Sequence, residues 1–84
     1  MVTVKEILSI SDYKITLLFN NEEIRRIDFY RFLELDKLKK GSIFQKFTEK
    51  GFISKVELAD YGTICWEREI DFCPDTLYKV GEKI

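Results

Sequence analysis

A chain of 84 residues is long enough for one domain with a modest core and too short for a second lobe, so a deep active-site cleft is not expected. Its 14 lysines and arginines and its 15 aspartates and glutamates give a formal net charge of -1, which lacks the basic excess that is usual in nucleic-acid-binding domains. Hydrophobic residues make up 45% of the sequence, yet no apolar run approaches the ~20 residues of a membrane span, so we expect one cytoplasmic domain over residues 1–84 without membrane association.

The first third of the chain predicts a three-stranded antiparallel meander. Aliphatic residues alternate at the start of residues 2–10, which indicates a strand of about eight residues. A second strand follows at residues 15–19, where one face is strongly apolar. Residues 20–22 are typical of a turn, and a third strand is expected at residues 23–29. Because the connections are too short to cross over, consecutive strands are expected to be neighbours.

The middle of the chain predicts a helix. A helical turn and a surface loop are expected over residues 30–41, where the alternation is lost. Ser42 and Gln45 then fit a capping box, and Gly51 is typical of a helix end. We therefore predict a central helix from Ile43 to Lys50. Its expected apolar stripe consists of Ile43, Phe44 and Phe47.

The last third predicts a hairpin and a closing helix. Residues 52–59 alternate as a fourth strand, which pairs with a β-branched and aromatic strand at residues 63–66. A turn or bulge at residues 67–69 leads to a second short apolar group at residues 70–73. Pro74 suits the first position of a helix that we expect to reach about Val80 and to stop at Gly81. The prediction is thus an α+β domain with a β-meander of three strands, a central helix, a β-hairpin and a short C-terminal helix.

The apolar residues and the cysteines predict structural roles. One core is expected to contain Leu17, Phe47, Trp66 and Leu77. Cys65 and Cys73 form neither a CxxC pair nor a disulfide pattern, and the chain has no histidine to complete the usual zinc sites. Both thiols are therefore expected to be reduced and buried, and no metal or cofactor is predicted.

The carboxylates predict no catalytic site. Nucleophilic catalysis by serine or cysteine normally needs a positioned base, most often histidine, which the chain lacks. Asp28, Asp71 and Asp75 could serve as acid–base groups or as a carboxylate metal site. Each has a structural explanation instead: a strand end, a turn that accepts backbone hydrogen bonds, and the first turn of a helix. We therefore expect a protein that is not an enzyme.

A lysine cluster raises the alternative of nucleic-acid binding. It consists of Lys37, Lys39, Lys40, Lys46, Lys50 and Lys55. Glu34, Asp36 and Glu49 are interleaved with these lysines, which favours a solvated surface of mixed charge over a phosphate track. Aromatic residues of the same region are spaced as core residues rather than as stacking platforms. Direct nucleic-acid binding is not expected, and a regulatory protein associated with DNA or RNA is the second functional hypothesis.

Two motifs resemble those of a short, largely bacterial family known as domain of unknown function 2442. The first motif consists of Phe19, Asn21, Glu23, Arg25, Ile27, Asp28 and Phe29, and the second consists of Gly62, Trp66, Asp71, Pro74, Asp75, Leu77 and Tyr78. The chain departs from the family at two turns, where Glu22 replaces a glycine and residues 67–69 replace a turn that is often Pro, Asn and Gly. A positive φ at Glu22 would cost roughly 1 kcal/mol relative to glycine.

The resemblance implies a fold without an established chemistry. Genes of the family often neighbour small genes of toxin–antitoxin type, so it also implies an accessory or antitoxin-like partner of a small protein. We therefore expect a non-enzymatic interaction module. Its first strand begins near the N-terminus, carries apolar Ile7, Leu8 and Ile10 on both faces and has no proline, so its edge is poorly defended against pairing. A two-fold homodimer through this edge is expected, and strand addition by a different protein is the alternative.

Overall fold

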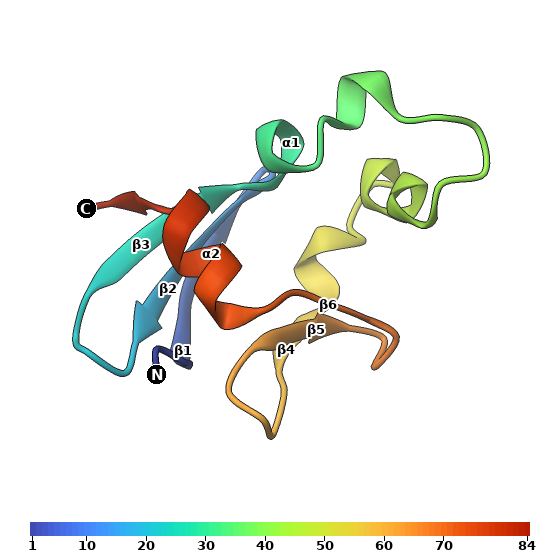
Figure 1. The fold of residues 1–84 in the computed structure, drawn as a ribbon. Helices are drawn as coiled ribbons and strands as arrows, with labels where there is room; N and C mark the ends of the chain where they lie inside the picture. Colours follow the sequence, from blue (N-terminus) through green and yellow to red (C-terminus); the bar gives the residue numbers. More distant parts are fainter.

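The computed structural model describes residues 1–84 and contains a four-stranded antiparallel sheet formed by the first three strands of the chain and the last one (Figure 1). The predicted meander is confirmed as β1 (Val4–Ser11), β2 (Lys14–Phe19) and β3 (Ile24–Asp28), in that order. A fourth strand that the sequence did not predict, β7 (Glu82–Lys83), pairs with β3 on the other side. β2 lies inside the sheet, between β1 and β3, and its apolar residues Ile15, Leu17 and Phe19 are fully buried.

A second, three-stranded sheet contains the predicted hairpin. Its strands are β4 (Val56–Leu58), β5 (Ile64–Trp66) and β6 (Ile70–Asp71), in that order. β4 is shorter than the strand predicted over residues 52–59, because a 3-10 helix, η3 (Ile53–Lys55), precedes it. Phe52 and Ile53 are both buried, and a helical turn can direct two consecutive side chains into the core whereas a strand directs them to opposite faces.

The central helix is a 3-10 helix rather than the predicted α-helix of residues 43–50. This helix, η2 (Ile43–Thr48), has Ser42 as its N-cap, as predicted, and the Ser42 side chain accepts a hydrogen bond from the backbone N–H of Phe44. Phe44 and Phe47 are three positions apart and are aligned by the 3-10 repeat, so both pack on the core. The third member of the predicted stripe, Ile43, is wrongly assigned, since its exposed fraction is 50%.

Two short α-helices flank this segment. The predicted helical turn after the meander is α1 (Phe29–Phe32), which leads into a 3-10 turn, η1 (Leu35–Lys37). The closing helix is confirmed as α2 (Pro74–Val80), with Pro74 at its start and Gly81 at its end. No helix has the length and apolar character needed to cross a membrane.

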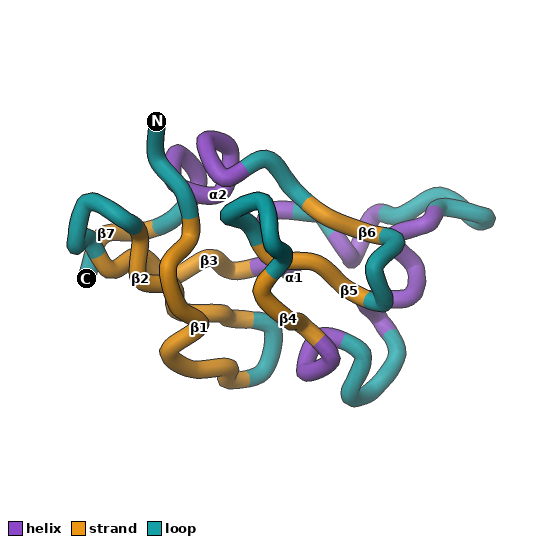
Figure 2. Tube along the Cα trace, turned by 90° about the horizontal axis from the view of Figure 1, so that it is seen from below, coloured by secondary structure: helices purple, strands orange, loops and turns teal.

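One core lies between the two sheets and the helices. Its predicted members Leu17, Phe47, Trp66 and Leu77 are all fully buried and belong to the same cluster of 14 residues. At the junction of the sheets, β1 lies next to β4, and the backbone N–H of Val4 donates to the carbonyl oxygen of Gly62 at 2.8 Å (Figure 2). Cys65 is buried as predicted. Cys73 is exposed, contrary to the prediction, because it occupies the N-cap of α2 at the surface.

The departures from the family pattern coincide with left-handed backbone. Glu22 has a φ of 70°, so the cost expected for a residue other than glycine applies at this turn. Glu67 and Arg68 have φ values of 54° and 57°, and the N–H of Glu69 donates to the carbonyl oxygen of Trp66 at 3.0 Å. Residues 67 and 68 thus form a tight hairpin turn of the type in which asparagine and glycine are usual.

Candidate functional site

Three polar side chains from the two motifs form a clasp between the β2–β3 turn and α2. The hydroxyl of Tyr78 donates to Glu23 Oε2 at 2.6 Å, and Arg25 Nη2 donates to Glu23 Oε1 at 2.8 Å. The guanidinium carbon of Arg25 lies 3.9 Å from the centre of the Tyr78 ring. Arg25 Nη1 also donates to the carbonyl oxygens of Tyr78 and Gly81 at the end of α2. The clasp therefore satisfies the helix end and fixes it against the meander.

The electrostatics of the clasp suit a structural role. The hydrogen bond from Tyr78, followed by that from Arg25, lowers the pKa of Glu23, so this carboxylate stays ionised. The Glu23 carboxylate in turn raises the pKa of Arg25. Both oxygens of Glu23 are engaged by donors within the chain. A general base needs a free oxygen directed at a substrate, and the clasp does not offer one.

Gly62 and Trp66 of the second motif also serve the fold. Gly62 has a φ of +83°, and a Cβ atom at this position would lie 2.9 Å from the Cβ of Thr3. Only glycine therefore allows the N-terminal segment to pass over the β4–β5 turn. The indole N–H of Trp66 donates to the carbonyl oxygen of Ile53 at 3.1 Å inside the core, where an unpaired indole N–H would be costly.

The three candidate carboxylates have separate partners. Asp28 Oδ1 accepts hydrogen bonds from the backbone N–H groups of Tyr30 at 3.1 Å and Arg31 at 3.3 Å, so it caps α1. Asp75 lies in the first turn of α2, as predicted. Asp71 accepts from the hydroxyl of Tyr61 rather than from the backbone, which corrects the prediction. This bond, together with partial desolvation, raises the pKa of Tyr61 to about 12.

Two of the six lysines in the cluster, Lys46 and Lys55, form ion pairs that the sequence did not predict. Lys46 Nζ lies 3.5 Å from a carboxylate oxygen of Glu67 and 3.3 Å from one of Glu69, and Lys55 Nζ lies 3.9 Å from Glu67. The hydrogen bond to Glu69 is the main reason that the pKa of Lys46 is raised. These pairs connect the β5–β6 turn to η2 through Lys46 and to η3 through Lys55. The paired carboxylates thus come from that turn and not from the interleaved residues Glu34, Asp36 and Glu49.

Beyond Val4, the outer edge of β1 makes no backbone hydrogen bond to another strand, although β4 lies beside β1. Among the backbone hydrogen bonds that lie outside the strand ladders, none involves residues 5–11. The side chains of Leu8 and Ile10 have exposed fractions of 40% and 37% on this edge. The pairing of β1 with β2 shifts register twice, once between Val4 and Glu6 and once between Ile7 and Ser9. β1 is therefore a bulged strand with a free edge.

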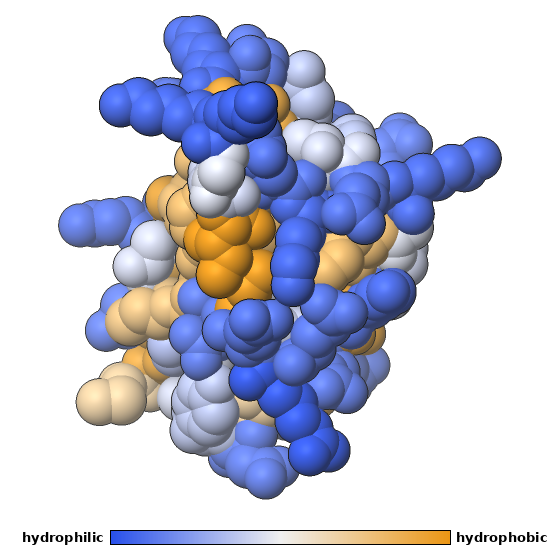
Figure 3. Space-filling view, turned by 90° about the vertical axis from the view of Figure 1, so that its right-hand side faces the viewer, coloured by the Kyte–Doolittle hydropathy of each residue, from blue (hydrophilic) through white to orange (hydrophobic).

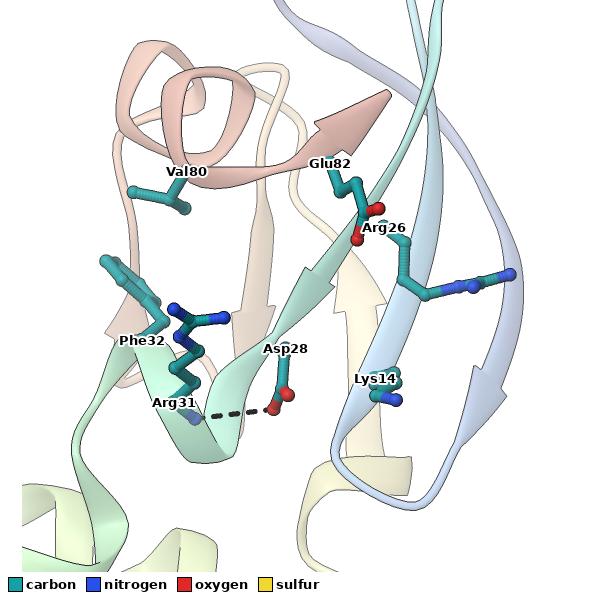
Figure 4. Close-up of a pocket in the computed structure, with 7 residues that line it drawn as sticks. All are labelled: Lys14, Arg26, Asp28, Arg31, Phe32, Val80 and Glu82. Atoms are coloured by element: carbon teal, nitrogen blue, oxygen red, sulfur yellow. Dashed lines mark hydrogen bonds between the residues drawn. The ribbon is translucent and has the colours of Figure 1, made fainter. Parts of the chain in front are cut away.

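A second surface feature is a pocket of about 470 Å³ beside α1 (Figure 4). Its lining residues are Lys14, Arg26, Asp28, Arg31, Phe32, Val80 and Glu82. Figure 4 shows that they come from both ends of the chain: from β2, from β3 and α1, and from α2 and β7. None of the three cationic side chains takes part in an ion pair. Sequence reasoning missed this pocket because its residues share no motif or spacing.

Apolar side chains are exposed on other faces as well. Figure 3 shows an apolar area enclosed by hydrophilic residues on the side of the molecule that lies to the right in Figure 1. Ile43 of η2 is among the exposed aliphatic residues. Ile43 lies on a helical turn, η2, whereas the β1 edge combines apolar side chains with free backbone groups.

Comparison with known proteins gives one match. The family model described as Protein of unknown function (DUF2442) matches residues 4–82, which include both motifs and every element from β1 to α2. No curated protein and no solved structure matches the chain.

Proposed function

The chain belongs to the family described as Protein of unknown function (DUF2442). We propose that it is a non-enzymatic module that binds another protein through the free edge of β1. The partner contributes an extended segment that pairs with residues 5–11. An accessory or antitoxin-like role beside a small protein is the narrower form of this proposal. The observation that carries it is the open edge, where apolar side chains lie next to unpaired backbone groups.

Strand addition uses both features of this edge. Free N–H and C=O groups on an edge strand pair with the backbone of an extended peptide, which supplies affinity, while side chains at alternate positions supply selectivity. Leu8 and Ile10 are two positions apart and offer aliphatic contacts to such a peptide. Lys5 and Glu6 precede them in β1. A partner residue of either charge near this end of the strand can therefore form an ion pair with one of these two side chains.

A different protein is a better occupant than a second copy of this chain. Residues 5–11 span about 23 Å, so the segment of a partner that pairs with this edge is short. In a symmetric pair, the two bulged strands would also have to accommodate each other's register shifts. A peptide without bulges needs to fit only one irregular edge.

The second candidate function is regulation through DNA or RNA. It is supported by four lysines of the cluster that have no ion pair. They are Lys37, Lys39, Lys40 and Lys50. The formal net charge of -1 weighs against it, because affinity for a phosphate backbone depends on a local excess of cations.

Edge variants test the proposal in native cells of the source organism. Leu8→Lys and Ile10→Lys place charges on the edge at exposed positions, so the fold is expected to tolerate them. Ile43→Lys is the matched control, since it makes the same change at an exposed aliphatic residue on another face. Val4 is unsuitable for substitution by lysine because it is buried in the core.

Affinity purification with the four proteins is expected to recover a stoichiometric partner with the wild type and with the Ile43 variant, and to lose it with both edge variants. In the purified complex, amide hydrogen exchange should slow in residues 5–11. Recovery of the same partner with the edge variants, or slowed exchange only around Ile43, would contradict the proposal. A sedimenting homodimer that Leu8→Lys dissociates would replace the proposed partner with a second copy. Salt-dependent binding to DNA or RNA that survives both edge variants would favour the second candidate.

A further inference from the structure

We propose that the pocket beside α1 binds a small monocarboxylate that carries an apolar group. The pocket is formed by the start of β2, the end of β3, α1, the end of α2 and β7. Its volume of about 470 Å³ lies in the range of small-molecule sites. This inference is independent of the β1 edge, since no residue of β1 lines the pocket.

Three cationic side chains, those of Lys14, Arg26 and Arg31, line the pocket and form no ion pair within the chain. Lys14 is the cross-strand neighbour of Asp28, and Arg26 is that of Glu82, yet neither pair forms an ion pair. Asp28 Oδ1 accepts hydrogen bonds from the backbone N–H groups at the start of α1. The side chain of Arg26 points away from Glu82 and extends across β2 (Figure 4), and its Nε lies 3.4 Å from Thr16 Oγ1. The hydrogen-bonding capacity of Lys14 and Arg31 is therefore free for a ligand.

The charge of the lining favours a single negative charge on the ligand. Three cationic side chains and the two carboxylates of Asp28 and Glu82 leave one net positive charge. A phosphate dianion or a polynucleotide would bring more negative charge than the pocket offsets and would lie against both carboxylates. A carboxylate instead matches the planar fork of one arginine, here Arg31, and Lys14 adds a positive charge to the same pocket lining.

The apolar part of the ligand is specified by the opposite wall. Phe32 and Val80 line the pocket, and Val80 is exposed in the absence of a ligand. Figure 4 shows the Phe32 ring and the Val80 side chain on one side of the Arg31 guanidinium and Asp28 and Lys14 on the other. A phenyl or branched alkyl group joined to a carboxylate would contact both walls, and burial of that group would add to the affinity.

Titration with phenylacetate tests this site. Two-dimensional 15N–1H NMR spectra of the full chain at low ionic strength are expected to show saturable shifts at Arg31, Phe32 and Glu82. Acetate lacks the apolar group, benzyl alcohol lacks the negative charge, and inorganic phosphate carries more negative charge than phenylacetate. Each of the three is therefore expected to bind at least about fivefold more weakly than phenylacetate. The double variant Arg31→Gln with Lys14→Gln should also weaken phenylacetate binding by about fivefold or more. Lys40→Gln, outside the pocket, should leave the affinity unchanged.

Three results would overturn the proposal. They are the absence of saturable shifts, equal affinity of the double variant and the wild type, and tighter binding of phosphate than of phenylacetate. Circular dichroism shows whether the double variant is folded. If it is not, Val80→Ser removes one of the two apolar residues that line the pocket and should weaken phenylacetate binding while leaving acetate binding unchanged. Equal weakening of both ligands would then count against the proposed apolar contact.

Discussion

Arg68→Gly is expected to stabilise the protein, because the tight turn between β5 and β6 places Arg68 at a φ of 57°. A left-handed conformation costs a residue other than glycine roughly 1 to 2 kcal/mol, while the greater freedom of glycine in the unfolded chain returns about 0.5 to 1 kcal/mol of that gain. The side chain of Arg68 makes no hydrogen bond or ion pair that the substitution would remove, whereas its neighbour Glu67 pairs with two lysines. The net expected gain is about 0.5 to 1 kcal/mol.

Thermal and urea unfolding, monitored by the fluorescence of the single tryptophan, measure this gain. For a domain of this size, it corresponds to a rise in Tm of about 2 to 8 °C. The matched control is Glu49→Gly, at an exposed position with a φ of -76°, where glycine gains nothing from the folded backbone and should destabilise by about 0.4 to 1 kcal/mol. If both variants changed the free energy of unfolding in the same direction, the left-handed backbone at Arg68 would not be the source of the effect.

Three further predictions concern the core, the hydrogen bond between Tyr61 and Asp71, and the thiols. Trp66→Ala should cost roughly 3 to 5 kcal/mol, a large part of the stability of so small a domain, and an unfolding midpoint within a degree or two of wild type would contradict the core assignment. Ultraviolet titration should show Tyr61 ionising near its raised pKa of about 12 and, in Asp71→Asn, closer to the ordinary value of about 10. The hydrogen bond of Tyr61 therefore adds stability that is complete below about pH 10 and is lost as the pH rises through about 12, and an unchanged titration of the Asp71 variant would refute this. A thiol reagent should label Cys73 quickly in the native protein and Cys65 only in denaturant, and equal rates for both would show that the surface N-cap position is misplaced.

Strong local sequence patterns made the first and last parts of the chain, the meander and the closing helix, predictable. The alternation of Ile15, Leu17 and Phe19 can bury one face only as a strand, and Pro74 can begin a helix but cannot continue one. The closing helix has the predicted bounds, because Pro74 marks its start and Gly81 its end. The motif residues were found from the sequence, but their contacts were not, because the hydrogen bond of Glu23 with Tyr78 joins residues 55 positions apart.

The middle of the chain was less predictable because its packing overrides its periodicity. Residues 43–55 carry apolar side chains at spacings that fit an α-helix and then a strand, yet the core accepts them as two 3-10 turns. Phe47 lies 4.8 Å from Trp66 between ring centres, and this aromatic contact selects the turn that brings both rings together. The β7 strand was missed because two polar residues, Glu82 and Lys83, carry no strand pattern. The pocket beside α1 depends on that strand and was missed with it.

Site-specific photocrosslinking tests the proposed β1 contact most directly. A photoreactive amino acid in place of Ile10 reports on the free edge, and the same residue in place of Ile43 reports on an exposed aliphatic position of η2. Irradiation of native cells is expected to join position 10 to one partner protein, with crosslinks confined to a short extended segment of it, and to leave position 43 without that product. Crosslinks from position 43 alone, or equal yields of the same partner from both positions, would contradict binding through the edge of β1.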